Sequence, residues 1–417
     1  MQKTLKALIT DPSLRIKLLW VLGLLAITRF IASVPLPGVD TDRLADFLAN
    51  NQIFEYLSLF SGSGFSTFSI ALLGLGPYIT ASILVQVSTM VFPSMKKLMH
   101  EEGELGRQKI TSYTRMLTIP FAFLQGFGLL KLLTSQGVIQ NNGFYAMFIM
   151  LCVVTATTMM MLWIGEKITE FGIGNGTSLI IFSGIAAGLP GKISQLVTTF
   201  DPSQIPLYIV LTLALILIIA AVVYMNEAER KVPIMYARAH GATQALATYL
   251  PLKLNQAGMI PIIFALAMFT MPQFLAQVLA ASSVPALAST GELIKSFFAN
   301  SWLYISVYFF LVFGFTYFYT SVVVEPHEMA KNLSKRGAYI PGIRPGESTE
   351  GYIGHIVSRI TFVGAVFLGL VAVLPIAIQS ATGIAAIAVG GTSVLIAVST
   401  ALETYKKIES QATLLEY

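Results

Sequence analysis

The sequence predicts an all-α membrane protein whose ten transmembrane helices form two inverted halves of five helices each. Three observations predict this fold: the composition, the recurrence of long apolar runs, and a short repeat in the order of the helices. Of the 417 residues, 55% are hydrophobic and only 11% are charged, whereas soluble domains carry about 25% charged residues. The mean hydropathy is +0.73. This composition disfavours a cytosolic or secreted globular protein.

Apolar runs that reach or approach the roughly 20 residues needed to cross a bilayer recur along the whole chain. The basic start, MQKTLKALITDPSLRIKLLW, is followed by no small-residue cleavage site, so we expect it to lead into the first helix rather than to act as a secretory signal. The apolar runs predict helices, in order, at residues 16–34, 68–92, 113–133, 145–165, 174–190, 206–225, 255–278, 302–322, 356–378 and 385–404.

The positions of the basic residues predict the orientation in the membrane. With the N-terminus inside, almost all of the 26 Lys and Arg residues fall in inner loops. Arg29 falls within the outer part of the first helix, and the outer loops hold only Arg43, Lys131, Lys192 and Lys295. Cytoplasmic loops are enriched in Lys and Arg. We therefore expect both termini in the cytoplasm, and the basic charge needs no nucleic-acid partner.

Two short sequences recur at corresponding helices. GTSLII (176–181) opens the fifth helix and GTSVLI (391–396) the tenth, while GLGPYITASI (74–83) and GMIPIIFALA (258–267) belong to the second and seventh. An odd number of helices per half inverts the second half, and such repeats place a working site near the midplane. We expect halves at residues 1–190 and 191–417. The alternative is that these small residues only allow close helix packing.

Two long inner loops, at residues 226–254 and 323–355, are expected to be functional or disordered because they have no obvious hydrophobic core of their own. The second loop contains YIPGIRPGES, in which prolines and glycines bracket Arg344. Proline fixes φ and glycine permits tight turns, so this bracket predicts a stiff tip that presents the arginine. A solvated turn is the alternative.

The sequence contains none of the common motifs for catalysis or cofactor binding. The four histidines lie in or beside inner loops and none forms HExxH, and the sequence has no GxSxG and no phosphate-binding loop with its GK[ST]. The single cysteine, Cys152, excludes an internal disulfide and is interpreted as a packing residue. We therefore expect no enzyme activity, no metal and no cofactor.

The predicted spans carry few charges. Arg29 is the main exception and is expected either to reach outward to water or to pair with a partner. An ion-coupled transporter would carry more buried charge, and an intramembrane enzyme would need a paired Ser/His or Asp/Asp set. The repeat elements instead present mostly aliphatic groups at the midplane, which would form a hydrophobic constriction or would simply pack against helices and lipid: Leu75, Ile79, Thr177, Ile181, Ile263 and Ile396.

The motifs LPGVD (36–40), ITEFGIGNGTSLIIFSGIAAGLP (168–190), LPLKLNQAGMIPIIFA (250–265) and PGIRPGE (341–347) closely resemble those of the SecY/Sec61-alpha family of protein-translocation channels. The resemblance covers essentially the whole chain in order. It implies a passive protein-conducting channel that passes unfolded secretory polypeptides across the membrane and releases membrane segments sideways into lipid.

The resemblance also assigns residues. The six midplane residues named above would form the pore ring, in which Thr177 departs from the usual aliphatic pattern. A re-entrant plug would lie at about residues 55–67 and includes Leu59, Phe60, Ser61, Gly62, Ser63, Gly64 and Phe65. The lateral gate, through which signal sequences reach lipid, would carry the polar residues Thr80, Gln86, Asn255 and Gln256.

The partners implied are the SecE and SecG subunits, the SecA motor, the ribosome, signal sequences, unfolded polypeptides and membrane lipid, with no small-molecule substrate. Arg344 would dock the motor or the ribosome, with Lys231 and Arg238 in support. Energy would come from that partner. The expected location is the bacterial inner membrane. Many relatives continue past Tyr417 by a short basic tail that is absent here.

Overall fold

A computed structural model describes residues 11–39, 68–100, 103–139, 143–198, 202–236, 248–280, 284–382 and 385–415. The chain folds into two compact units. Unit 1 comprises Met1–Asp201, Leu266–Tyr304 and Thr400–Tyr417, and unit 2 comprises Pro202–Ala265 and Ile305–Ser399. The division into halves after residue 190 stays a prediction from the repeat.

Unit 1 consists of helices. They are α2 (Pro12–Ser33), α5 (Gly76–Val91), α6 (Pro93–His100), α7 (Gly103–Ser135), α8 (Gly143–Phe171), α9 (Gly176–Thr198) and α12 (Pro285–Ala299). Local chemistry sets where α2 begins: the side chain of Asp11 accepts a hydrogen bond from the Ser13 N–H at 2.9 Å, and Pro12 takes the first helical position. A capping carboxylate followed by proline is a strong helix start.

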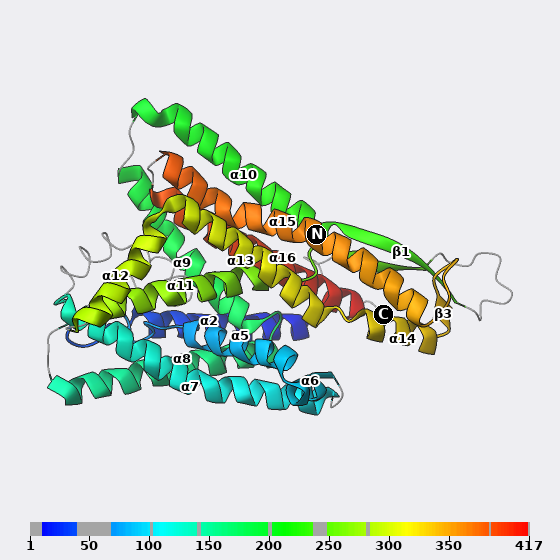
Figure 1. Ribbon diagram of the computed structural model, residues 1–417, viewed down its shortest axis with the longest axis horizontal. Helices are drawn as coiled ribbons and strands as arrows, with labels where there is room; N and C mark the ends of the chain where they lie inside the picture. The colour runs from blue at the N-terminus through cyan, green and yellow to red at the C-terminus, as the bar shows by residue number, and fades with distance from the viewer. Residues whose placement is uncertain are drawn as a thin grey trace. The chain divides into compact units, whose positions relative to one another are not determined.

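The helices of unit 1 pack as neighbours in a bundle. α7 contacts both α5 and α8, and α2 contacts α8 and α9; Figure 1 shows α7 and α8 side by side. The core of this bundle is aliphatic and includes Leu72, Leu129 and Leu133, all essentially inaccessible to solvent. Some contacts need the absence of a side chain, because a Cβ added to Gly176 of α9 would lie 1.8 Å from the carbonyl oxygen of Gly165 on α8.

Unit 2 contains the helices η1 (Pro202–Gln204), α10 (Ile205–Glu227), α14 (Pro326–Lys335) and α15 (Glu347–Thr382). Three helices have residues in both units: α11 (Ile260–Ala280), α13 (Ser301–Val323) and α16 (Ala385–Leu415). Within unit 2, an aliphatic cluster joins α10, α15 and α16 through Val222, Val371 and Leu395.

Each of the ten predicted stretches overlaps a helix, although residues 68–75 and 255–259 of two of them are not helical. Seven helical stretches in the described part of the chain are long and apolar enough to cross a membrane: Pro12–Ser33, Gly103–Ser135, Gly143–Phe171, Ile205–Glu227, Ile260–Ala280, Trp302–Lys335 and Glu347–Ser380. The helix α5 has only 16 residues. The chain is therefore a multi-pass membrane protein of mainly helical structure. The exact number of spans stays a prediction.

The described parts of the two long loops fold together around a core, so these parts are not disordered, while a functional role of the loops stays a prediction. They form β1 (Glu229–Tyr236), β2 (Thr248–Lys253) and β3 (Ala338–Tyr339), antiparallel in the order β2-β1-β3. In β1, Val232 and Ile234 are buried while the residues between them are exposed, as the two-residue period of a strand requires. Ile340 and Ile353 complete the cluster. We call β1–β3, α14 and the first turns of α15 the strand cap; Figure 1 shows it at one end of α15.

The core of the strand cap takes residues from both loops. Val232 and Leu252 come from the first loop, and Ile353 comes from the second. The partner of β1 on one side, β3, lies about a hundred residues further along the chain. The pairing of β1 with β3 therefore cannot be predicted from either loop alone.

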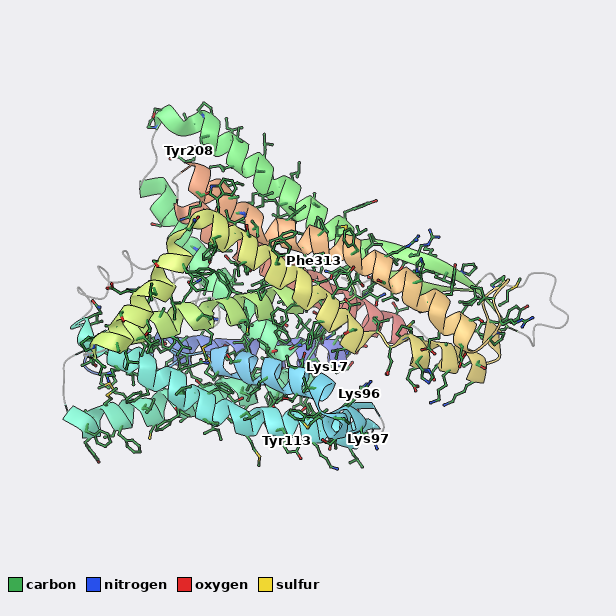
Figure 2. All side chains as sticks on the ribbon, in the orientation of Figure 1. Lys17, Lys96, Lys97, Tyr113, Tyr208 and Phe313 are labelled. Carbon is green, nitrogen blue, oxygen red and sulfur yellow. The ribbon has the colours of Figure 1, made fainter. Side chains whose placement is uncertain are left out.

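Basic residues gather at one end of unit 1. Figure 2 shows Lys17 of α2, with Lys96 and Lys97 of α6, toward the same end of this bundle. All three were predicted to face the cytoplasm. Their common position is what a biased distribution of basic residues across a membrane would produce.

Candidate functional site

The residues of unit 1 that were predicted to lie at the midplane belong to α5, with the position just before it, and to α9, and they are mostly buried. Leu75 immediately precedes α5 and is 0% exposed, and Ile79 is one turn later and 5% exposed. The Ile79 N–H donates to the Leu75 carbonyl at 3.0 Å, so the helical turn begins at Leu75 and places both side chains on one face. Ile181, on α9, is also buried.

Thr177 is the polar member of the predicted ring, and its hydroxyl has a local partner. It donates to the side-chain oxygen of Asn175 at 2.7 Å, and the same oxygen accepts the Thr177 N–H at 3.1 Å. Asn175 is thus the N-cap of α9. The Thr177 methyl group packs over Gly165, 3.3 Å from where a Cβ would stand there. Because the Thr177 hydroxyl already donates its hydrogen to Asn175, it has no hydrogen left to donate to another group.

The midplane residues of unit 2 are also aliphatic and buried. Ile263 follows Pro261 in the first turn of α11 and is 6% exposed, and Ile396 of α16 is 0% exposed. The next residue after Ile263, Phe264, makes edge-to-face contacts with Phe315 and Tyr319 of α13. Aromatic contacts of this kind fix the rotation of α11 about its axis and with it the direction of Ile263.

The predicted gate residues of α5 have weak partners. Thr80 donates to the Gly76 carbonyl at 3.1 Å and accepts from the Gln125 side chain of α7 at 3.3 Å. Gln86 donates to Ser82 at 3.3 Å, and its buried carbonyl oxygen has no hydrogen-bond partner among the described residues. An unsatisfied buried carbonyl costs about 1–3 kcal/mol. These two side chains therefore keep hydrogen-bonding capacity for another partner.

Asn255 is tied into unit 2 by a network that the sequence did not predict. Its amide donates to the Asn226 side chain of α10 at 2.7 Å and to the Gly258 carbonyl at 3.2 Å, while Asn226 donates to Ser399 of α16 at 3.4 Å. Asn226 lies 29 residues before Asn255, so no helical spacing links them. Gln256 is half-buried beside this network.

Arg29 pairs with a partner within the bundle of unit 1. Its guanidinium donates to the Ser183 hydroxyl of α9 at 2.9 and 3.2 Å and to the Ile180 carbonyl at 3.4 Å. Of the two alternatives drawn from the sequence, the structure thus shows pairing. These hydrogen bonds join α2 to α9.

The turn around Arg344 is stiff and the side chain is exposed. Gly342 and Gly346 have φ values of 81° and 102°, which favour glycine. The Thr349 hydroxyl donates to the Arg344 carbonyl at 2.9 Å, and the Ile343 N–H donates to the Ile340 carbonyl at 3.1 Å. The backbone is therefore held from both sides while the guanidinium lies in solvent.

Lys231 lies on the exposed side of β1, where its ammonium sits 4.7 Å from the centre of the Tyr249 ring and 3.7 Å from a carboxylate oxygen of Glu229. These contacts orient the side chain without burying it. Arg238 and the whole predicted plug, including Leu59, Phe60, Ser61, Gly62, Ser63, Gly64 and Phe65, lie outside the described residues.

Groups of three or more His, Cys, Asp or Glu side chains that could hold a metal ion do not occur in the described part of the chain. The residues that do come together are aliphatic side chains at the helix turns, isolated amides, and an exposed arginine on a rigid tip. This set suits binding by shape and charge.

Known proteins similar to this chain fit these features. A sequence model of the SecY family matches residues 69–405. Proteins named protein translocase subunit SecY are 39% identical in Aquifex aeolicus, over 98% of this chain and 97% of theirs, and 41% identical in Thermus thermophilus, over 97% and 94%.

Solved structures share the fold at lower identity. One described as a protein-conducting channel has a TM-score of 0.66 and 18% identity, covering 94% of this chain and 91% of its own. Another, concerning the plug domain of SecY and the closed state of the translocation channel, has a TM-score of 0.67 and 19% identity over the same shares. With a family match across most of its length and full-length relatives near 40% identity, the chain belongs to the SecY family.

Proposed function

We propose that this chain is the channel subunit of a protein translocase, passing unfolded secretory polypeptides across the membrane and releasing membrane segments sideways into lipid. The observation that carries this proposal is membership of the SecY family over nearly the whole chain. The chain is a channel component and not a catalytic enzyme. Energy for transport would come from a partner, either a SecA motor or a ribosome.

The proposed architecture is ten spans in two inverted halves, residues 1–190 and 191–417, in the bacterial inner membrane. The overlap of each of the ten predicted stretches with a helix supports it, and so does the grouping of Lys17, Lys96 and Lys97 at one end of unit 1. Both termini would then face the cytoplasm, and the strand cap would stand on the same side.

The proposed pore ring is Leu75, Ile79, Thr177, Ile181, Ile263 and Ile396. A ring of aliphatic groups excludes water when narrow and so blocks ions. It offers an extended polypeptide almost no hydrogen bonds, because the one hydroxyl in the set is engaged by Asn175. Transport through it would therefore depend little on the substrate's sequence. A plug at residues 55–67 would seal the ring from outside.

The proposed lateral gate carries Thr80, Gln86, Asn255 and Gln256. Hydrogen bonds between polar side chains in a membrane contribute only about 0.6–2 kcal/mol each. The free carbonyl of Gln86 and the long bonds of Thr80 fit a seam that exchanges partners when it opens. SecE and SecG would complete the complex around this subunit.

An arrested substrate tests the pore ring. A secretory polypeptide that carries a cysteine-reactive crosslinker halfway along its length would be stopped in the channel. Single cysteines, introduced one at a time in a Cys152→Ser background, would form adducts with the crosslinker where they contact the polypeptide. We expect adducts at Leu75, Ile181 and Ile396 and none at Leu217, which is 70% exposed on α10 and serves as the lipid-facing control. Adducts at Leu217 alone would contradict the pore assignment.

A charge reversal tests the docking surface, which we assign to Arg344 with Lys231 and Arg238 in support. Arg344→Glu is expected to reduce motor-driven translocation at least about tenfold, because the reversed charge would repel the docking partner. The fold should be kept, because the Arg344 side chain is exposed. Arg336→Glu is the matched control, since Arg336 is also exposed in the strand cap but lies at the end of α14. Equal loss in both variants would contradict a specific role of the tip.

A further inference from the structure

The helix α12 is too short to cross a membrane and lies between two helices that do. Its 15 residues span about 22 Å, whereas a bilayer-spanning helix needs about 20 residues. It follows α11 and precedes α13, so it stands at the membrane face where α11 leaves the bilayer. Figure 1 shows α12 inclined steeply to α7 and α8 of the same unit.

One side of α12 is fixed against α11. A Cβ added to Gly291 would lie 2.4 Å from the backbone nitrogen of Ala280 and 2.7 Å from the Ala276 carbonyl oxygen. The Phe298 ring meets the Phe269 ring edge to face, with centroids 5.2 Å apart. These contacts fix the rotation of α12 about its own axis relative to α11.

The two exposed flanks of α12 differ in chemistry. Leu293 and Phe297, four residues apart, form one flank and are 70% and 50% exposed. Glu292 and Lys295, three residues apart, form the other flank and are also exposed. At about 100° per residue, the packed side that carries Gly291 and Phe298 lies between these two flanks.

We propose that α12 is an interfacial helix that lies in the plane of the membrane surface, with Leu293 and Phe297 inserted among the lipid acyl chains. Glu292 and Lys295 then face water on the opposite flank. An amphipathic helix buries its apolar face about 5–10 Å into the boundary between headgroups and acyl chains. The packed side against α11 points sideways, along the membrane.

The helices before and after α12 in the chain also expose apolar side chains. Met268 and Leu275 of α11 are exposed apolar residues of a membrane-spanning helix. Trp302, at the start of α13, is 78% exposed, and tryptophan is enriched where a membrane meets water.

Charge on α12 favours lipid over a charged protein partner. The exposed polar flank carries one acid and one base, which gives no net charge to attract a partner of either sign. Insertion would therefore be driven by apolar area, and it should not depend on anionic lipid. This inference needs only the membrane-spanning helices and does not rest on the channel function.

Single cysteines on the full chain in vesicles test the proposal. In a Cys152→Ser background, Leu293→Cys and Phe297→Cys probe the apolar flank, while Glu292→Cys and Lys295→Cys are controls on the polar flank of the same helix. Vesicles would be phosphatidylcholine alone or with phosphatidylglycerol. Because only a hydrated thiolate reacts, a charged maleimide should label the first pair at least about tenfold more slowly.

A fluorophore on the same cysteines distinguishes lipid from protein cover. We expect quenching by nitroxide-labelled lipid at 293 and 297, quenching by aqueous iodide at 292 and 295, and the same result in both vesicle types. Equal labelling and iodide quenching at all four positions would overturn the proposal. Shielding of 293 and 297 from both quenchers would also overturn it, because a protein surface would then cover the flank.

Discussion

The helices of unit 1 and the strand cap of unit 2 achieve close packing by different means. In unit 1 the tightest contact comes from a missing side chain, where α9 meets the α8 backbone at Gly176. In the strand cap the contact comes from large aliphatic side chains, among them Val232 and Ile353, gathered from segments far apart in sequence. Lipid is as apolar as leucine, so helices in a membrane gain little by burying leucine and rely on close approach. In the proposed arrangement the strand cap stands in water, where the hydrophobic effect holds it together.

The largest expected effect is in the strand cap. Ile353→Ala would remove a side chain that is 0% exposed. It should destabilise the cap by about 3 kcal/mol, because lost burial and the resulting cavity both contribute. Hydrogen exchange of the β1 amides would measure this. Tyr352→Ala, at a neighbouring position that is 39% exposed, is the control and should change exchange far less. Equal effects would mean that the cap has no hydrophobic core.

The next effect tests close approach in unit 1. Gly176→Ala should destabilise the bundle by about 2–3 kcal/mol, because the added methyl meets a backbone carbonyl that cannot rotate away. Gly188→Ala, on the same helix, is matched to it, since nothing lies within 4 Å of a Cβ at Gly188. Thermal aggregation of the purified protein would compare the two. If both variants behaved like the parent, the contact of α8 with α9 would be looser than described.

A third prediction concerns the polar link in unit 1. The coupling of Arg29 with Ser183 should be about 1–2 kcal/mol, because charged hydrogen bonds are stronger than neutral ones but remain modest in membranes. A double-mutant cycle of Arg29→Gln and Ser183→Ala would isolate this coupling. If the losses in the free energy of unfolding were strictly additive, the two residues would act independently.

The sequence predicted the helices well, because each span depends on its own apolar run. It could also have predicted the cap of α9, since Asn175 stands directly before the helix and bonds the Thr177 N–H only two residues away. Contacts between distant segments could not be predicted from the sequence. Ser183 lies 154 residues from Arg29, and the strand cap joins two loops that have no core alone. Pairings of that kind depend on the packed fold, which no local periodicity records.

The smallest expected effect is on the surface of the strand cap, where His327 of α14 and Glu350 of α15 lie 2.8 Å apart. The two side chains are 63% and 40% exposed, so water competes for both. Exposed ion pairs contribute about 0.2–1 kcal/mol, and we expect no more than about 0.5 kcal/mol of coupling here. A double-mutant cycle of His327→Ala and Glu350→Gln, read by hydrogen exchange of β1, would measure it. A coupling as large as the effect of Ile353→Ala would contradict the comparison between unit 1 and the strand cap. The cap would then be held by charge rather than by its buried aliphatic core.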